Sequence, residues 1–185
     1  MVGVDASIAL ALWFPDVPSS VPKAKERVEY LVQNFASTNE RILIPTPALS
    51  EVLVRAGSAG LEFVNQMARS SRFEIAPFDT LAAIEVSIAI ASAIRSGNKR
   101  GKNMKDTWAK IKFDHQIVAI CKVREVKTLY SDDPGLCSFA ERMGIHTYAL
   151  ADLPLPTEEP NLFSQLEEQM EQPALPAPTN AAPTE

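Results

Sequence analysis

Cysteine and histidine are scarce in this chain of 185 residues, and their scarcity argues against the usual zinc sites. Cys121 and Cys137 show no CxxC spacing, and with only His115 and His146 beside them they do not complete a pattern typical of zinc ligands. The sequence shows no export signal, so both cysteines are interpreted as reduced, buried thiols.

The sequence also shows no segment with the features of a secretory signal or a membrane-spanning helix. The opening stretch, MVGVDASIALALWF, has no basic region before its apolar residues, and Asp5 interrupts it. It is too short to cross a bilayer. We therefore expect a cytoplasmic protein without membrane association.

Two common nucleotide-binding motifs, GxGxxG and GxxxxGK[ST], are absent, which argues against dinucleotide and P-loop folds. Basic residues are absent from the end of the chain. Residues 151–185 contain seven acidic residues and no lysine or arginine, so residues 1–150 carry a net charge of about +2 although the whole chain has −5. The negative total therefore does not exclude a nucleic-acid partner.

The first 150 residues alternate between strand and helix patterns. Short apolar strands are predicted at residues 2–5, 41–45, 73–78, 128–131 and 145–150. Helices are predicted between them, at residues 22–36, 46–56, 61–70, 80–94, 114–125 and 135–144 and directly after the first strand. This alternation indicates an α/β fold with a mainly parallel sheet of about five strands, covered on both faces.

Beyond residue 150 the composition changes. Seven of the fourteen prolines lie in residues 151–185, which predicts a mostly disordered, acidic, Pro-rich tail. One candidate helix at 161–171 would place Leu162, Phe163, Leu166 and Met170 on one side. We therefore divide the chain into a domain at 1–150 and a tail at 151–185.

Acidic residues from distant segments are expected at one edge of the sheet. Asp5 ends the first strand, Asp132 and Asp133 end the fourth, and helices begin at the same edge near Glu51 and Asp114. Carboxyl ends of parallel strands share one edge, where ligands bind in such folds. Two carboxylates about 4 Å apart repel by about 4 kcal/mol at an effective dielectric of 20, so a cluster of them must hold protons or bind cations. Carboxylate oxygens favour Mg²⁺ or Mn²⁺ over Zn²⁺.

Each acid also has a purely structural interpretation. Asp5 and Asp114 would serve as helix caps, Glu51 as a solvated helical residue, and Asp132 and Asp133 as turn residues. Asp79 is interpreted as a helix cap and Glu85 as a solvated position, so neither is assigned to the site.

Four segments, VDAS, PALSEVLVR, KFDHQIVAI and LYSDDPGL, occur in the order found in PIN-domain nucleases. The first 150 residues resemble the VapC-type toxin ribonucleases of type II toxin–antitoxin systems. This resemblance implies a three-layer α/β/α sandwich with Asp5, Glu51, Asp114 and Asp133 as its four catalytic acids. In this family the fourth acid follows a Thr/Ser-x-Asp pattern, with an apolar residue three positions later. Ser131, Asp133 and Leu136 match that pattern, so Asp133 is assigned as the fourth acid. The resemblance implies metal ligation by Asp5, Asp114 and Asp133, with Asp132 as an additional acid and Ser131 and Ser7 in support.

The connection at residues 97–113 is longer and more basic than is usual in this family. Six basic side chains and one tryptophan in it are candidate RNA-binding residues: Lys99, Arg100, Lys102, Lys105, Lys110, Lys112 and Trp108. The alternative is a solvated loop with Trp108 in the core. The acidic tail would compete with RNA if it folded across this segment.

The expected function is hydrolysis of RNA phosphodiester bonds with Mg²⁺, or Mn²⁺ in its place. As a toxin the chain would need an antitoxin protein, and family analogy also suggests a homodimer. The main alternative is an inactive PIN-like module that binds RNA or protein. A phosphoacceptor domain fits less well, because it needs an acidic pair after the first strand and a lysine at the edge.

Overall fold

The predicted alternation of strands and helices is present in the computed structural model, which describes residues 1–14, 19–95 and 108–156. The elements are, in chain order, β1 (Val2–Val4), α1 (Ala6–Trp13), α2 (Ala24–Ser37), β2 (Ile42–Pro45), α3 (Thr46–Ala56), η1 (Gly57–Ala59), α4 (Gly60–Ala68), β3 (Phe73–Ala76), α5 (Thr80–Arg95), α6 (Trp108–Val123), β4 (Thr128–Tyr130), α7 (Pro134–Arg142), β5 (His146–Tyr148) and η2 (Leu150–Asp152). Met1–Leu155 form one compact unit. The candidate tail helix at 161–171 lies outside the described residues.

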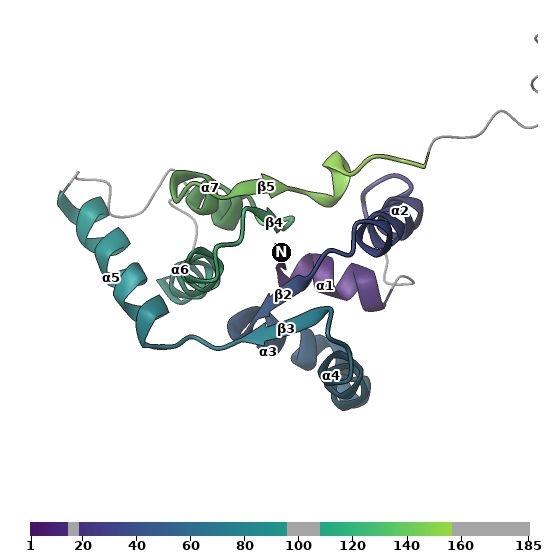
Figure 1. The fold of residues 1–185 in the computed structure, drawn as a ribbon. Helices are drawn as coiled ribbons and strands as arrows, with labels where there is room; N and C mark the ends of the chain where they lie inside the picture. The colour runs from purple at the N-terminus through teal and green to yellow at the C-terminus, as the bar shows by residue number, and fades with distance from the viewer. Residues whose placement is uncertain (15–18, 96–107, 157–185) are drawn as a thin grey trace, which may run out of the picture. The chain divides into compact units, whose positions relative to one another are not determined.

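The five strands form one parallel sheet with the order β3-β2-β1-β4-β5 (Figure 1). From β1 the chain moves outward through β2 to β3, and it then returns across the sheet to β4 and β5. The direction of winding therefore reverses between β1 and β4. In parallel sheets, this reversal is where a crevice opens at the carboxyl ends of the strands.

Helices cover both faces of the sheet. On one face, a Cβ atom on Gly3 would lie 3.0 Å from Sγ of Cys121 in α6 and 3.1 Å from Leu129, so α6 packs directly on β1 and β4. On the other face, Phe35 of α2 makes an edge contact with Tyr130, with the ring centroids 5.6 Å apart. Because neighbouring strand residues point to opposite faces, Leu129 and Tyr130 define the two sides. The arrangement is the three-layer α/β/α sandwich that was predicted.

Two predicted helix boundaries can be compared with the structure. Gly57 was expected to end the helix after the second strand, and it is the C-terminal cap of α3 with a φ of 54°, a conformation that favours glycine. The helix predicted at 114–125 is longer than expected. It begins at Trp108, so Asp114 lies in its second turn and not at its start. The basic residues before Asp114 were interpreted as part of a connection, yet Lys and Ala are good helix formers.

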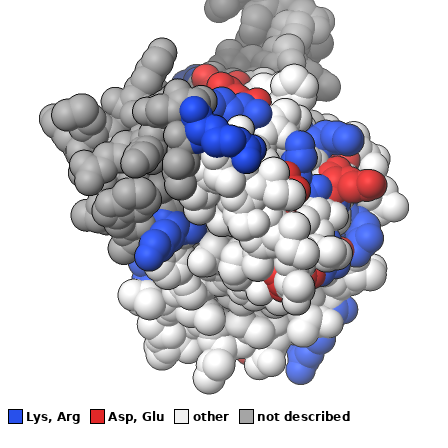
Figure 2. Space-filling model, turned by 90° about the vertical axis from the view of Figure 1, so that its left-hand side faces the viewer, with Lys and Arg blue, Asp and Glu red and all other residues white. Residues whose placement is uncertain are grey.

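Helix α5 carries an apolar face exposed to solvent. Leu81, Ile84 and Ile88 are 61%, 51% and 55% exposed, and their spacing puts them on one side of the helix. The side of the molecule that α5 occupies in Figure 1 faces the viewer in Figure 2, and few charged side chains lie in the centre of that view. We call Leu81, Ile84 and Ile88 the α5 face.

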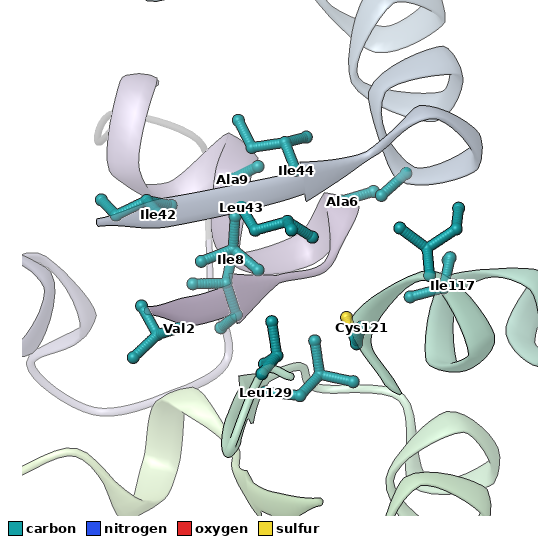
Figure 3. Packing of buried hydrophobic residues seen from close by; sticks show 14 of the residues in the cluster. Val2, Ala6, Ile8, Ala9, Ile42, Leu43, Ile44, Ile117, Cys121 and Leu129 are labelled. Atoms are coloured by element: carbon teal, nitrogen blue, oxygen red, sulfur yellow. The ribbon is translucent and has the colours of Figure 1, made fainter. Parts of the chain in front are cut away.

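The core lies between the sheet and its two helical layers (Figure 3). Leu43 and Leu129 are fully buried on the two strands that flank β1, and Gly3 lies in register with both. The small Gly3 leaves the room that Cys121 and Leu129 fill. Within the described ranges, no helix has the length and apolar character needed to cross a membrane.

Candidate active site

The site predicted at the carboxyl edge of the sheet begins with Asp5 and Ser131, which directly follow the adjacent strands β1 and β4. The backbone N–H of Asp5 donates to the carbonyl oxygen of Tyr130 at 3.0 Å, which holds the two strand ends together. Ser131 is likewise held, because its N–H donates to the carbonyl oxygen of Tyr148 on β5 at 3.0 Å. Both side chains are buried.

The Asp5 carboxylate is fixed by three hydrogen bonds. Oδ1 accepts from the backbone N–H of Ala6 at 2.6 Å, so Asp5 caps the first turn of α1. Oδ2 accepts from Oγ of Ser131 at 2.8 Å and from Oγ of Ser7 at 3.3 Å. The structural interpretation of Asp5 as a helix cap is therefore correct, and it leaves one oxygen turned toward the end of β4.

Asp133 is the N-terminal cap of α7. Its Oδ1 accepts from the backbone N–H groups of Gly135 at 2.7 Å and Leu136 at 3.1 Å. Its own N–H donates to Oγ of Ser131 at 3.0 Å. The Ser131 hydroxyl thus accepts from Asp133 and donates to Asp5, and it links the two acidic residues within one hydrogen-bonded network.

The pKa of Asp5 depends on its burial, on its hydrogen bonds and on the charge of Asp133. Burial raises the pKa of Asp5, and the negative charge of Asp133 raises it further, while hydrogen bonds from Ser131, Ala6 and Ser7 act in the opposite direction. Asp5 makes no ion pair with any residue in the described ranges. A carboxylate in this setting favours either a proton or a cation as its neighbour.

Both cysteines lie near this pair, and both stay protonated near neutral pH. Burial, followed by the charge of Asp5, raises the pKa of Cys121 to about 12. Burial also raises the pKa of the half-buried Cys137, and the charges of Asp133 and Asp5 add to the effect. Neither thiol is suited to act as a nucleophile or metal ligand, because both roles require the thiolate.

Asp132, the other member of the acidic doublet, has a different environment. Its Oδ1 accepts from the backbone N–H of Leu150 at 2.7 Å, at the start of η2, and its N–H donates to Oγ of Ser7 at 3.1 Å. The side chain is exposed. The adjacent residues Asp132 and Asp133 therefore hold two different parts of the chain, η2 and the first turn of α7.

Glu51 and Asp114 are placed on α3 and α6. Glu51 lies in the second turn of α3, as predicted, and is exposed, whereas Asp114 is 9% exposed and continues the buried stripe of Val118 and Cys121. Across residues 1–14, 19–95 and 108–156, no three His, Cys, Asp or Glu side chains form a group that could hold a metal ion. Asp133 acts electrostatically on Asp5, and the joint role of Asp5, Glu51, Asp114 and Asp133 as one catalytic site stays a prediction.

The chemistry of this pair fits Mg²⁺ in one respect. Mg²⁺ is usually bound in proteins by one or two carboxylates, and it keeps several waters and takes oxygens from substrate phosphates. Two aspartates at a hydrogen-bonded strand edge can supply such a partial set of ligands. A closed site made only of protein ligands, as zinc would need, is not present in the described part of the chain.

The basic segment can be followed only in part. Lys112 is exposed on α6. Lys99, Arg100, Lys102 and Lys105 lie outside the described residues, as do the side chains of Lys110 and Trp108. Their predicted contact with RNA stays a prediction.

Compared by sequence, the chain matches no protein-family model and no curated protein. Solved structures do match. A chain of DNA-bound VapBC from Salmonella typhimurium is 19% identical with a TM-score of 0.52, and the match covers 81% of this chain and 99% of that one. A chain of VapBC2 from Rickettsia felis, bound to a DNA fragment from its promoter, is 15% identical with a TM-score of 0.51, and the coverage is 80% and 98%. At this identity the likeness concerns the fold, and it confirms that the chain has the PIN-like α/β/α fold that its motifs resemble.

Proposed function

We propose that this chain is a divalent-metal-dependent endoribonuclease, acting as the toxin of a toxin–antitoxin pair. The observation that carries the proposal is the linked pair of Asp5 and Asp133 at the reversal point of a PIN-like sheet. A buried carboxylate whose pKa is raised by burial and by a second carboxylate is typical of a functional site.

In this proposal, Asp5 and Asp133 hold the ion, and Asp114 and Glu51 complete the site from α6 and α3. A bound Mg²⁺ or Mn²⁺ would supply Lewis-acid chemistry, lowering the pKa of a water and offsetting charge on the leaving oxygen. The Ser131 hydroxyl keeps the Asp5 carboxylate oriented, because it donates to Oδ2 at 2.8 Å. The caps on α1 and α7 fix the two aspartates on rigid helix starts.

The first prediction is that single-stranded RNA is cleaved with Mg²⁺ or Mn²⁺ and left intact in EDTA. Asp114→Asn should lower the rate by more than about 100-fold, because ligand losses exceed the 10- to 100-fold effect of residues that only orient ligands. Cleavage is measured on a labelled oligonucleotide, with Glu62→Gln as a control that removes an exposed carboxylate on α4. Equal rates in EDTA, or equal rates for Asp114→Asn and wild type, would contradict the proposal and leave the inactive module as the better interpretation.

The proposed antitoxin can be examined with the same cleavage assay. The two similar structures are of VapBC complexes, which motivates a partner protein for this chain as well. Protein copurified with its neighbouring small protein should cleave RNA more slowly than the isolated chain. An unchanged rate in the copurified complex would argue for a housekeeping ribonuclease.

We also propose that a second copy of the chain covers the α5 face. Apolar side chains at three positions of one helix are a suitable centre for a two-fold interface, in which the same residues meet from both copies. The wild type is therefore expected to have the mass of a dimer by light scattering. Changing both Ile84 and Ile88 to Glu should yield a monomer of unchanged fold. Ala83→Glu, which adds a charge elsewhere on the exposed surface of α5, should stay dimeric, and a monomeric wild type would rule this interface out.

A further inference from the structure

A groove of about 180 Å³ runs along α1, next to the candidate site. Ser7, Ala11 and Phe14 line it at a spacing that puts them on one side of the helix. Ser7 also donates to Oδ2 of Asp5, so the groove begins beside the Asp5 carboxylate. From Ser7 to Phe14 the helix rises by about 10 Å, at about 1.5 Å per residue. The groove therefore extends well beyond a single reacting phosphate.

Two cations reach this groove from different helices. Arg55 comes from α3, one turn after Glu51, and Lys25 comes from the first turn of α2. The guanidinium of Arg55 is exposed and makes no hydrogen bond or ion pair with any residue in the described ranges. Among the described lining residues one is acidic, Asp132, and its Oδ1 accepts from the N–H of Leu150.

A structural interpretation of Arg55 is available. Arginine in the last turn of a helix interacts favourably with the helix dipole, and Arg55 lies in the last turn of α3. That interaction does not require a groove, a second cation from α2 or an adjoining hydroxyl. The combination of Arg55, Lys25 and the Ser19 hydroxyl around one hollow is typical of a site for an anion with hydrogen-bond acceptors.

The apolar and aromatic side chains that line the groove indicate which class of anion fits it best. Leu10, Ala11 and Val28 give the groove apolar walls, and the half-buried Phe14 lines it as well. Single-stranded nucleic acid combines regularly spaced phosphates with flat bases that stack on aromatic rings. An acidic peptide would satisfy the cations but has no comparable use for the aromatic wall.

We infer that this groove binds the phosphate backbone of the RNA strand beside the cleaved bond, with Arg55 as the main phosphate ligand and Lys25 as a second cation. The choice of RNA as the ligand rests on the proposed function. The geometry gives the path of the strand, because the groove leads from Asp5 along α1 toward Phe14. Sequence reading missed Arg55, although its position four residues after Glu51 already placed both on one side of α3.

The test is binding of a labelled single-stranded RNA in EDTA, where no cleavage is expected, measured by fluorescence anisotropy at several salt concentrations. Arg55→Ala should bind roughly tenfold more weakly, the effect of losing one hydrogen bond to a charged group. The slope of log affinity against log salt should become less steep by about 0.7. Arg55→Lys should retain most of the affinity. Arg69→Ala, which removes an exposed arginine at the end of α4, should behave as the wild type.

The outcomes separate this inference from the proposed function. If Arg55→Ala binds RNA like Arg69→Ala, with an unchanged salt slope, the groove is not an RNA site, whether or not the wild type cleaves RNA. If Arg55→Ala loses affinity and the wild type fails to cleave with Mn²⁺, the groove is an RNA-binding site and the nuclease proposal fails. If Arg55→Ala weakens binding of poly-glutamate and leaves RNA binding unchanged, the groove serves an acidic protein and the inference is overturned. Absence of RNA binding by the wild type would overturn it as well.

Discussion

Asp133→Asn is expected to reduce RNA cleavage by more than about 100-fold, whereas Asp132→Asn should retain most of the wild-type rate. The two residues are neighbours in sequence, and each substitution removes one negative charge. Their environments differ, since Asp133 acts electrostatically on Asp5 and Asp132 accepts a hydrogen bond from the N–H of Leu150. Only the charge at Asp133 is next to the proposed metal position.

Asparagine is the appropriate replacement at both positions because it preserves the structural roles. Asn caps helices about as well as Asp, so the bonds from Gly135 and Leu136 to Oδ1 should persist in Asp133→Asn. In Asp132→Asn, the amide oxygen can still accept from Leu150. Asp133→Ala would lose the cap as well, at about 1 kcal/mol of stability, and would mix the two effects.

Initial cleavage rates with Mn²⁺ and thermal unfolding midpoints should be measured for both asparagine variants. The midpoints should stay close to that of the wild type, so that a loss of rate is assigned to chemistry. Equal losses in Asp132→Asn and Asp133→Asn would contradict the assignment of Asp133 as the fourth acid. A larger loss in Asp132→Asn would reverse it.

The fold followed from the sequence because its signals are local. Apolar strands of three or four residues, separated by helical patterns, are enough to predict a parallel sheet, and Gly57 marks the end of α3 by a backbone conformation that glycine favours. The start of α6 was missed because a basic stretch was interpreted as a loop, while Trp108–Phe113 already form helix. Binary patterns locate the buried side of a helix better than its first residue.

The candidate site was predictable only in part, because its geometry depends on distant contacts. Asp5 and Asp133 follow adjacent strands, so the edge of the sheet brings them together once the strand order is known. Only the family resemblance selected Asp133 from the doublet. The contact of Asp132 could not be predicted locally, since its partner is Leu150, eighteen residues later. The position of Glu51 early in its helix could be predicted, whereas Asp114 lies in the second turn of α6 and not at its start.

Asp5→Asn is expected to abolish cleavage and, without metal, to raise the thermal midpoint by a few degrees at pH 7. Burial is the main reason, because it raises the pKa of Asp5, and the charge of Asp133 raises it further. A carboxyl with a raised folded-state pKa binds its proton more tightly in the folded protein. Folding is therefore opposed by ionised Asp5 at neutral pH, and an amide of the same shape removes that penalty while Oδ1 still caps α1.

The pH dependence of this gain has a definite sign. The difference in midpoint between Asp5→Asn and the wild type should be full above the folded-state pKa of Asp5. It should shrink as the pH falls through that value toward the unfolded value of 3.8, because protonated Asp5 is neutral like the amide. Glu62→Gln, which removes an exposed charge, should show no such gain.

Divalent metal should reverse the order of the two proteins. A ligand that binds only the folded state stabilises it, so Mn²⁺ should raise the midpoint of the wild type and leave that of Asp5→Asn nearly unchanged. Differential scanning fluorimetry with and without Mn²⁺ measures both effects in one experiment. If Asp5→Asn were less stable than the wild type in EDTA at pH 7, the buried carboxylate would be a structural group whose hydrogen bonds outweigh its desolvation. If Mn²⁺ stabilised both proteins equally, the ion would bind elsewhere, and the acidic edge of the sheet would not be the metal-dependent catalytic site.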